Sequence, residues 1–416
     1  MERILIFFGK LISVVSSATN LGAGATWPGE IALRLDPDIL TPLSQKVRKG
    51  IILVAGTNGK TTTTLMLKTI LERQGDSVIH NGSGANLLNG IVSSFIQHAS
   101  WTGTIEADWG VFEVDENSLP IVIKSIKSIK LKVVIVLLNL FRDQLDRYGE
   151  VDVIAEKWRK LKFDCLIANA DDPLIAEIAR KAIKNVTFFG LDDPSQYMEK
   201  MEHATDSTFC PRCGTRLTYK GIYYSHIGDW SCPKCKNKRP ALDISTWDYP
   251  LPGLYNRYNT LAAVATAKTV GIADQNIKQA LQNFSPAFGR QEEFTVDGKK
   301  VKIFLSKNPA GFNESLRTVI QLDAKQILFV LNDRIPDGRD VSWIWDVDFE
   351  MLPENINIFV SGDRAYDAAL RLKYAGIRDI RVINDIREAV QNDLYILPTY
   401  SAMLDVRKIL TGKKIL

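Results

Sequence analysis

The sequence predicts an α/β protein with a parallel sheet in its central part and a second α/β domain after it. Continuous apolar runs alternate with helical stretches, such as 61–74 and 152–161, from residue 50 to about 200. This alternation is typical of a parallel sheet that is covered by helices on both faces. A similar pattern resumes near residue 294, and 416 residues exceed the usual size of one domain. We therefore expect two or three domains, each with its own core.

The expected strands of the central sheet are the runs 51–55, 109–114, 133–138, 165–168 and 186–189. A helical segment over 256–283 precedes the second domain, which we expect to be Rossmann-like. Its expected strands are 301–305, 327–332, 356–360, 380–383 and 394–397. The predicted boundaries are a lead-in over 1–48, a central domain over 49–288 and a C-terminal domain over 289–416.

Composition and charge narrow the class of protein. The hydrophobic share of 45% and the charged share of 24% are ordinary for a globular protein. A net charge of +4 is too small over this length to indicate a nucleic-acid partner, although it suits anionic ligands. Five cysteines do not indicate a disulfide scaffold, so we expect a reducing cytoplasm.

Residues 1–20 are expected to be helical. Their apolar run is interrupted by Gly9 and Lys10, lacks the features of a signal peptide, and is too short to span a bilayer. Two interpretations stay open: a helix packed on the main domain, or a helix that faces a membrane surface or a partner. The glycine-rich loop 21–30 is either a linker or a second side of an anion site.

The segment IILVAGTNGKTTTT, residues 51–64, predicts a phosphate-binding loop between a strand and a helix. It misses the general pattern G-x-x-x-x-G-K-[ST], because Val54 stands where the first glycine is expected. Glycines in the loop let backbone amides face phosphate oxygens, and the helix start adds its positive dipole end. Lys60 is expected to contact the β- and γ-phosphates, and the Thr61 hydroxyl to bind Mg²⁺. The expected nucleotide-binding residues here are Gly56, Thr57, Asn58, Gly59, Lys60, Thr61 and Thr62.

Glu113 lies inside the apolar strand of VFEVDE, residues 111–116. A carboxylate is costly to bury unless it is paired or lies near a metal. We therefore predict Glu113 as a catalytic residue that binds Mg²⁺ or holds a water molecule. Asp115 and Glu116 either face the same crevice or belong to a solvated loop.

Four cysteines form two CxxC pairs: Cys210, Cys213, Cys232 and Cys235. This spacing predicts a closed tetrahedral zinc site, which is structural rather than catalytic. The site would hold an inserted ribbon over about 205–240, and the residues between the two pairs are expected to form a short hairpin. His226 lies in that hairpin and is expected at the surface rather than as a ligand.

Four motifs resemble those of the Mur ligase family, the ATP-dependent ligases of peptidoglycan synthesis, and of folylpolyglutamate synthase. The short loop GTNGKTT is the family's normal form, and ANADDP (168–173) resembles its N-x-D-D-P turn. GLYNRYNTLAA (253–263) resembles the helix start G-x-H-N-x-x-N-x-x-A-A, and FGRQEEF (288–294) resembles the G-R-x-E hinge. Four matches in the family's order are far more specific than any one of them.

Departures from these motifs indicate a branch of the family. Gln144 and Tyr255 stand where the family has histidines, and the carbamylated lysine has no convincing candidate. These changes, the cysteine pairs, DGRDVSWIWD (337–346) and the segment 24–40 resemble the MurT branch. MurT-type proteins are the ligase-like subunits of lipid II isoglutaminyl synthase and work with a glutaminase subunit, GatD. The resemblance covers essentially the whole chain.

The resemblance implies ATP-dependent amidation. The α-carboxylate of D-glutamate in the lipid II stem peptide would become D-isoglutamine through an acyl phosphate, in a cytoplasmic heterodimer that is either free or peripheral at the membrane. It also implies Asn256 and Asn259 as nucleotide or hinge contacts and Arg290 as a phosphate contact. Asn259 has a simpler alternative as the start of a packed helix. The competing functions are an amino-acid-adding Mur or folylpolyglutamate-type ligase and a zinc-ribbon scaffold without catalysis.

Cys165 is the only cysteine outside the CxxC pairs, and it lies in the apolar run FDCLIAN. We expect a buried core cysteine there, without the setting of a nucleophile. A glutaminase needs a nucleophilic cysteine with a histidine base, and His80, His98 and His203 share no motif with Cys165. The chain is therefore expected to depend on a partner glutaminase for ammonia.

The segment 331–350 is rich in acidic residues and tryptophan, and it follows an expected strand. Ligands bind at the carboxyl ends of strands in α/β folds. The residues expected to line a cleft there are Asp337, Asp340, Asp346, Trp343 and Trp345. The resemblance implies one catalytic aspartate, with Asp340 as first choice and Asp337 as second. In the alternative, Ser342 or Asp340 caps a helical turn and the tryptophans are core residues.

Overall fold

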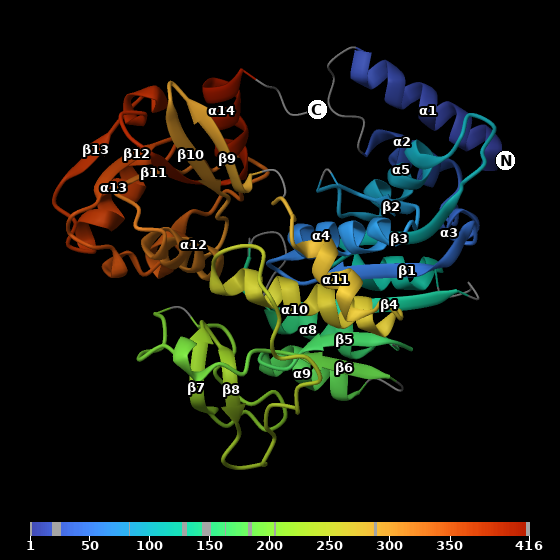
Figure 1. The fold of residues 1–416 in the computed structure, drawn as a ribbon, viewed down its shortest axis with the longest axis horizontal. Helices are drawn as coiled ribbons and strands as arrows, with labels where there is room; N and C mark the ends of the chain where they lie inside the picture. Colours follow the sequence, from blue (N-terminus) through green and yellow to red (C-terminus); the bar gives the residue numbers. More distant parts are fainter. Residues whose placement is uncertain are drawn as a thin grey trace.

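The computed structural model describes residues 2–18, 26–82, 84–126, 131–143, 151–162, 164–181, 185–203, 205–286 and 289–412. These residues form two six-stranded sheets and a two-stranded ribbon. Figure 1 shows the C-terminal domain (orange to red) beside the central domain (blue to green), with the ribbon below them. Within the described ranges, no helix is both long and apolar enough to cross a membrane.

The central sheet is parallel throughout and has the order β2-β3-β1-β4-β5-β6. Its strands are β1 (Val47–Ala55), β2 (Val78–His80), β3 (Ala107–Val114), β4 (Lys132–Leu137), β5 (Leu166–Asn169) and β6 (Val186–Phe189). The five expected strands and the parallel sheet are confirmed. The edge strand β2 was missed, because three residues are too few to carry a pattern.

Helices cover both faces of this sheet, as expected. The side chains of β1 alternate between two cores, with Ile51 and Leu53 on one face and Ile52 and Val54 on the other. Helices α4 (Lys60–Arg73), α10 (Leu254–Thr269) and α11 (Asp274–Leu281) contribute to the second core. The first core is built by α1 (Glu2–Ala18), α2 (Trp27–Leu35), α3 (Leu40–Ser44), α5 (Leu88–His98), α6 (Leu119–Ile126), α8 (Val151–Arg159) and α9 (Pro173–Arg180).

Helix α1 is packed on one side only. Leu5 and Ile6 are buried, and the helix contacts α2 and α5. Ile12 is half-buried, and five large apolar side chains of the helix are exposed, namely Ile4, Phe7, Phe8, Leu11 and Val14. Helix α1 therefore packs on the central domain, and the apolar face on its other side is exposed. Most of the glycine-rich loop, residues 19–25, lies outside the described residues.

The ribbon is an antiparallel hairpin of β7 (Thr218–Tyr224) and β8 (Ile227–Ser231), as expected. The expectation that His226 is at the surface is wrong, because its side chain is completely buried. The hairpin turn folds onto the central domain, where His226 Nε2 lies 3.4 Å from Asp172 Oδ2. The Trp230 indole also donates to the Ala170 carbonyl at 3.0 Å, so the ribbon is anchored at both ends of β8.

The C-terminal sheet has the order β13-β12-β11-β14-β10-β9. Its strands are β9 (Arg290–Val296), β10 (Lys299–Phe304), β11 (Gln326–Val330), β12 (Asn357–Ser361), β13 (Ile380–Val382) and β14 (Leu394–Pro398). The helices on it are α12 (Pro309–Gln321), α13 (Ala365–Tyr374) and α14 (Tyr400–Thr411). The five expected strands are confirmed, and the sheet is mixed because β9, which was missed, runs antiparallel to β10. The domain boundaries themselves stay predictions.

Candidate nucleotide and ligase site

The phosphate loop joins β1 to α4 in the conformation that its glycines allow. Gly56 has φ +140° and Gly59 has φ +92°, a region that other residues seldom adopt. A Cβ atom at Gly59 would lie 2.1 Å from Asn259 Oδ1. Glycine at this position therefore lets α10 approach the loop closely, which brings Asn259 beside the expected nucleotide.

The end of β4 braces this loop through Asn139. The Asn58 amide donates to Asn139 Oδ1 at 2.9 Å, and Asn139 Nδ2 donates back to the Asn58 carbonyl at 3.1 Å. The Thr57 hydroxyl accepts from the amide of Phe141 at 3.0 Å. Sequence reasoning considered this segment only for Gln144, which lies outside the described residues, and so missed Asn139.

Lys60 is buried in the loop, and its charge is paired. Its Nζ donates to the carbonyl oxygens of Gly56 at 2.5 Å and Thr57 at 3.2 Å, and lies 3.3 Å from Glu116 Oε2. A buried ammonium needs such partners, because its desolvation is costly. Glu116 therefore faces the crevice and does not belong to a solvated loop, which was the alternative interpretation. Asp115 is also buried and accepts from the Asn117 amide in the turn after β3.

Glu113 meets Thr61 at the start of α4. The Thr61 hydroxyl donates to Glu113 Oε2 at 2.5 Å, and the Glu113 side chain is only 2% exposed. The Glu113 backbone amide is held by Asn81 Oδ1 at 2.9 Å, which fixes the strand end. A hydroxyl and a carboxylate oxygen side by side are ligands that suit Mg²⁺, so the donor set fits the predicted ion.

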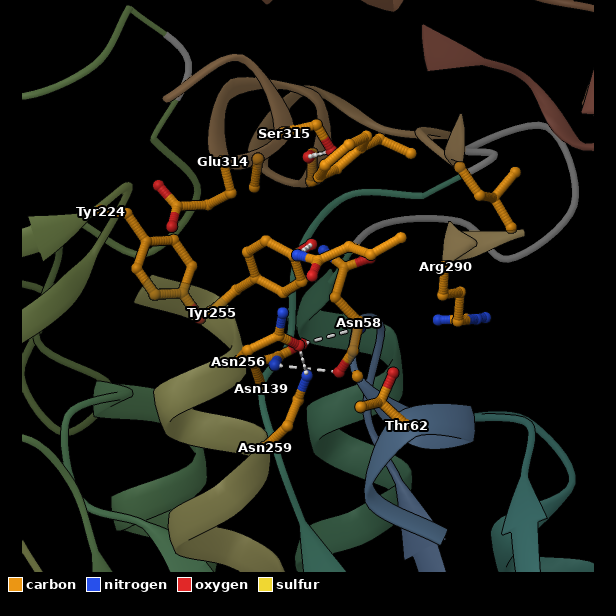
Figure 2. A pocket seen from close by; sticks show the side chains of 16 residues that line it. Asn58, Thr62, Asn139, Tyr224, Tyr255, Asn256, Asn259, Arg290, Glu314 and Ser315 are labelled. Carbon is orange, nitrogen blue, oxygen red and sulfur yellow. Dashed lines mark hydrogen bonds between the residues drawn. The ribbon is translucent and has the colours of Figure 1, made fainter. Parts of the chain in front are cut away.

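A cavity, here called the first cavity, opens between the loop, α10, the ribbon and the C-terminal domain (Figure 2). Its lining includes six of the predicted nucleotide residues: Asn58, Gly59, Thr62, Asn256, Asn259 and Arg290. Gly56 and Thr57 belong to the adjoining loop, and Lys60 and Thr61 are the first residues of α4. The two asparagines of α10 are linked, since Asn259 Nδ2 donates to Asn256 Oδ1 at 3.1 Å. Residues far apart in the chain thus line one cavity, and their role in nucleotide binding stays a prediction.

Arg290 and Gln291 enter this cavity from the first residues of β9. Burial lowers the pKa of Arg290, and the nearby Glu113 carboxylate opposes that shift. Gln291 has φ +63°, and its Nε2 donates to the Tyr255 hydroxyl at 2.6 Å and the Pro252 carbonyl at 2.9 Å. Tyr255, at the family's histidine position, thereby ties α10 to the C-terminal domain. Sequence reasoning did not assign roles to Gln291 and Tyr255.

A second cavity lies between the central and C-terminal domains. It is lined by Arg142, Asp143, Lys307, Asn308, Pro309, Asp337, Asp340, Ser342, Trp343 and Asp346. Lys307 forms an ion pair with Asp143. Burial alone would lower the pKa of Lys307, but the carboxylates of Asp143 and Glu116 outweigh it and raise that pKa. The sequence analysis did not predict Lys307, although a cation two residues after the expected strand 301–305 could have indicated it.

The two predicted aspartates differ sharply in this second cavity. Asp337 is buried and accepts from both the amide and the hydroxyl of Ser401. Asp340 is exposed, and its Oδ1 accepts from the Ser342 amide at 2.8 Å, so it caps the turn and also lines the cavity. The expectation that Trp345 lines the cleft is wrong. Its ring is 46% exposed and packs edge-on against Tyr374, because it points to the other side of the turn.

The two cavities are separated by a pair of amides. Asn58 Nδ2 donates to Asn308 Oδ1 at 3.2 Å, and Asn308 Nδ2 donates to Asn58 Oδ1 at 3.0 Å. Asn58 lines the first cavity, and Asn308 lines the second. The phosphate loop therefore lies at the junction of both.

The four CxxC cysteines form one cluster. The Sγ atoms of Cys210 and Cys235 lie 3.6 Å apart and those of Cys213 and Cys232 lie 3.5 Å apart, with all four within 4.8 Å of one another. Thiolates about 2.3 Å from a tetrahedral zinc ion would be separated by about 3.8 Å, so the cluster fits that ion. Cys165 is buried in its strand region, as expected, and burial raises the pKa of its thiol.

Comparisons with known proteins agree with this architecture. Residues 54–267 match the family model of the Mur ligase middle domain, and residues 305–403 match that of the MurT ligase C-terminal region. Several relatives carry the name lipid II isoglutaminyl synthase (glutamine-hydrolyzing) subunit MurT. The one from Staphylococcus aureus (strain COL) is 34% identical over 94% of this chain and 90% of its own length. The one from Streptococcus pneumoniae is 34% identical over 95% and 94%.

Solved structures share the fold at lower identity. A pseudomurein peptide ligase type C from Methanothermus fervidus superposes with a TM-score of 0.68 at 22% identity, covering 89% of this chain and 80% of that one. MurF from Acinetobacter baumannii gives a TM-score of 0.62 at 18% identity, covering 92% and 79%. The Mur ligase fold brings with it the use of ATP. From the two family models and the near full-length relatives, the chain belongs to the MurT family of Mur ligases.

Proposed function

We propose that this chain is the synthetase subunit of a glutamine-hydrolysing lipid II isoglutaminyl synthase. It would use ATP to convert the α-carboxylate of D-glutamate in the lipid II stem peptide to an amide, which leaves D-isoglutamine. One observation carries the proposal. The phosphate loop contacts, through Asn58 and Asn308, a C-terminal region that matches the MurT model and presents a second, highly charged cavity.

The first step activates the carboxylate, which is otherwise a poor electrophile. A carboxylate oxygen attacks the γ-phosphorus of ATP, the bond to the β,γ-bridging oxygen breaks, and ADP leaves. Lys60 and Arg290 would neutralise the charge on the transferring phosphoryl group, which is the main way in which proteins accelerate such steps. Thr61 and Glu113 would hold Mg²⁺, which supplies further charge neutralisation.

The second step forms the amide bond. The nitrogen of ammonia attacks the acyl carbon, the bond to the phosphate oxygen breaks, and a proton leaves the nitrogen. Asp340 is our first choice to position ammonia and receive that proton, because its exposed carboxylate lines the second cavity. Asp337 is the weaker candidate, since both of its oxygens already accept hydrogen bonds from Ser401.

Ammonia would come from a separate glutaminase subunit, with free ammonia as a substitute. Cys165, the only cysteine outside the zinc cluster, is buried, and a buried thiol with a raised pKa is a poor nucleophile. The name of the relatives, which describes glutamine hydrolysis and a subunit, supports this division of labour.

Two further parts of the molecule support the assembly in this proposal. The four cysteines would hold one structural zinc ion, which stabilises a ribbon that has little core of its own.

The exposed apolar face of α1 would lie at the inner surface of the membrane that carries the lipid-linked substrate, with Lys10 beside Trp101 at its edge. Flotation of the chain with phospholipid vesicles, reduced by Phe7→Glu, is the expected result; equal flotation of both proteins would contradict it.

The test of the proposed function is amide formation on lipid II. The chain, its glutaminase partner, glutamine and ATP are expected to give D-isoglutamine-containing lipid II, measured by mass spectrometry. Free ammonium should replace glutamine and the partner. Addition of an amino acid instead of ammonia would point to an amino-acid-adding ligase, and an absence of ATP turnover in the complex would point to a scaffold.

A further inference from the structure

Glu314 is a buried carboxylate of α12 that lines the first cavity. Its side chain is 2% exposed, and Oε1 forms an ion pair with Arg317. Its Oε2 is buried and has no hydrogen-bond partner in the described part of the chain. A buried acceptor without a hydrogen-bond donor destabilises the protein. A ligand atom that carries hydrogen could donate to Oε2 and remove this cost.

Arg317 is shared by two carboxylates, since Glu202 also pairs with it. Burial raises the pKa of Glu314 to about 7, against the opposing charge of Arg317. Burial raises the pKa of Glu202 as well. Of the two glutamates, Glu314 and Glu202, only Glu314 is among the described residues that line the first cavity. Glu202 is therefore a matched control: the same chemistry and the same partner, outside the cavity.

The cavity has a phosphate end and an opposite end. Gly59 and Thr62 belong to the phosphate loop and the first turn of α4. Figure 2 shows Glu314 and Tyr224 on the side of the cavity away from Thr62 and Arg290, with Tyr255 between them. A nucleoside triphosphate with its phosphates at the loop extends toward this aromatic end. Planar purine bases pack well against tyrosine rings, and Glu314 lies where the edge of such a base would point.

We propose that Glu314 selects the purine base, with Oε2 accepting a hydrogen bond from the exocyclic amine of adenine. This inference rests on the proposed use of ATP, and it adds the residue that discriminates between nucleotides. Guanine presents an oxygen where adenine presents the amine, and that oxygen would face the carboxylate without a hydrogen between them. A site that hydrogen-bonds one group rejects an analogue that lacks it, because its own buried polar atom is then left unpaired.

The first experiment uses the unmodified full-length chain. Isothermal titration calorimetry at pH 8 compares ATP with purine riboside 5′-triphosphate, which has the same phosphates and ring but no exocyclic amine. ATP is expected to bind at least about tenfold more tightly, which is the size of one buried hydrogen bond to a charged group. Equal affinity of the two nucleotides would overturn the inference and leave the proposed function intact. Binding of neither would overturn both.

The second experiment compares Glu314→Gln with Glu202→Gln. A glutamine amide both donates and accepts, so in Glu314→Gln it can also bond the guanine oxygen. The ratio of the ATP and GTP affinities is expected to fall at least about tenfold in Glu314→Gln and to stay within about twofold in Glu202→Gln. An unchanged ratio in Glu314→Gln, or an equal fall in both variants, would show that Glu314 acts only through Arg317 and would overturn the inference.

Discussion

The two cavities on either side of the Asn58–Asn308 amide pair differ in their chemistry. Most of the side chains that line the first cavity are uncharged, with amides and aromatic rings predominating. The second cavity is lined by six charged side chains: Arg142, Asp143, Lys307, Asp337, Asp340 and Asp346. Uncharged polar and aromatic groups suit a nucleotide base and sugar, whereas dense charge suits a carboxylate, its acyl phosphate and ammonia. Under the proposed function, nucleotide binding and amide formation would therefore take place in neighbouring compartments.

The largest effect is expected from Lys60→Ala, which removes the cation at the junction of the compartments. Amidation with ATP and ammonium should fall at least about 100-fold, because a charge-neutralising group at the phosphoryl transfer is lost. Steady-state product formation on lipid II checks this. Lys68→Ala on the same helix is the control and should leave the rate unchanged, since Lys68 forms a surface ion pair with Glu72.

The next effect separates the two aspartates of the second cavity. Asp340→Asn is expected to lower kcat about tenfold or more while the affinity for ATP stays the same, because the positioned base is lost outside the first cavity. Asp337→Asn should instead lower the melting temperature, since it weakens the bonds to Ser401. If Asp337→Asn instead lowers kcat and keeps a normal melting temperature, Asp337 and not Asp340 is the positioned base.

Removal of zinc should affect the first cavity more than the second. Tyr224 of the ribbon lines the first cavity, and no described ribbon residue between 205 and 240 lines the second. Cys232→Ser is expected to lose the bound zinc, to melt at a lower temperature and to bind ATP more weakly. Metal analysis, thermal unfolding and calorimetry check this. Cys165→Ser is the control and should keep its zinc; full zinc occupancy in Cys232→Ser would contradict the four-thiolate site.

The smallest effect concerns pH. Burial raises the folded-state pKa of Glu314 from 4.5 to about 7, so the folded protein holds this proton more tightly than the unfolded chain does. The resulting stabilisation is complete below about pH 4.5 and is lost as the pH rises through about 7. Glu314→Gln has no proton to lose, so its melting temperature relative to the unmodified chain should rise by about 2 °C or more between pH 5 and pH 8. A difference that stays constant with pH would contradict the buried carboxylate.

Much of the first compartment could be predicted from local sequence. The loop from Gly56 to Thr62 and the two CxxC pairs carry their chemistry in a few adjacent residues, and the apolar runs are long enough to specify strands. Residues whose role depends on distant partners could not be found in this way. Lys307 matters because the fold brings it to Asp143, and Gln291 because it reaches Tyr255. His226 was misplaced for the same reason: nothing near it in the chain indicates that the hairpin turn folds against Asp172.

The central claim is that the chain activates a carboxylate by phosphorylating it. The most direct measurement uses lipid II in which both oxygens of the D-glutamate α-carboxylate are ¹⁸O, followed by mass spectrometry of the released inorganic phosphate. One ¹⁸O atom is expected in the phosphate for each amide formed, because the oxygen that attacked the γ-phosphorus leaves with it. Amide formation with unlabelled phosphate would contradict an acyl phosphate and, with it, this account of the site.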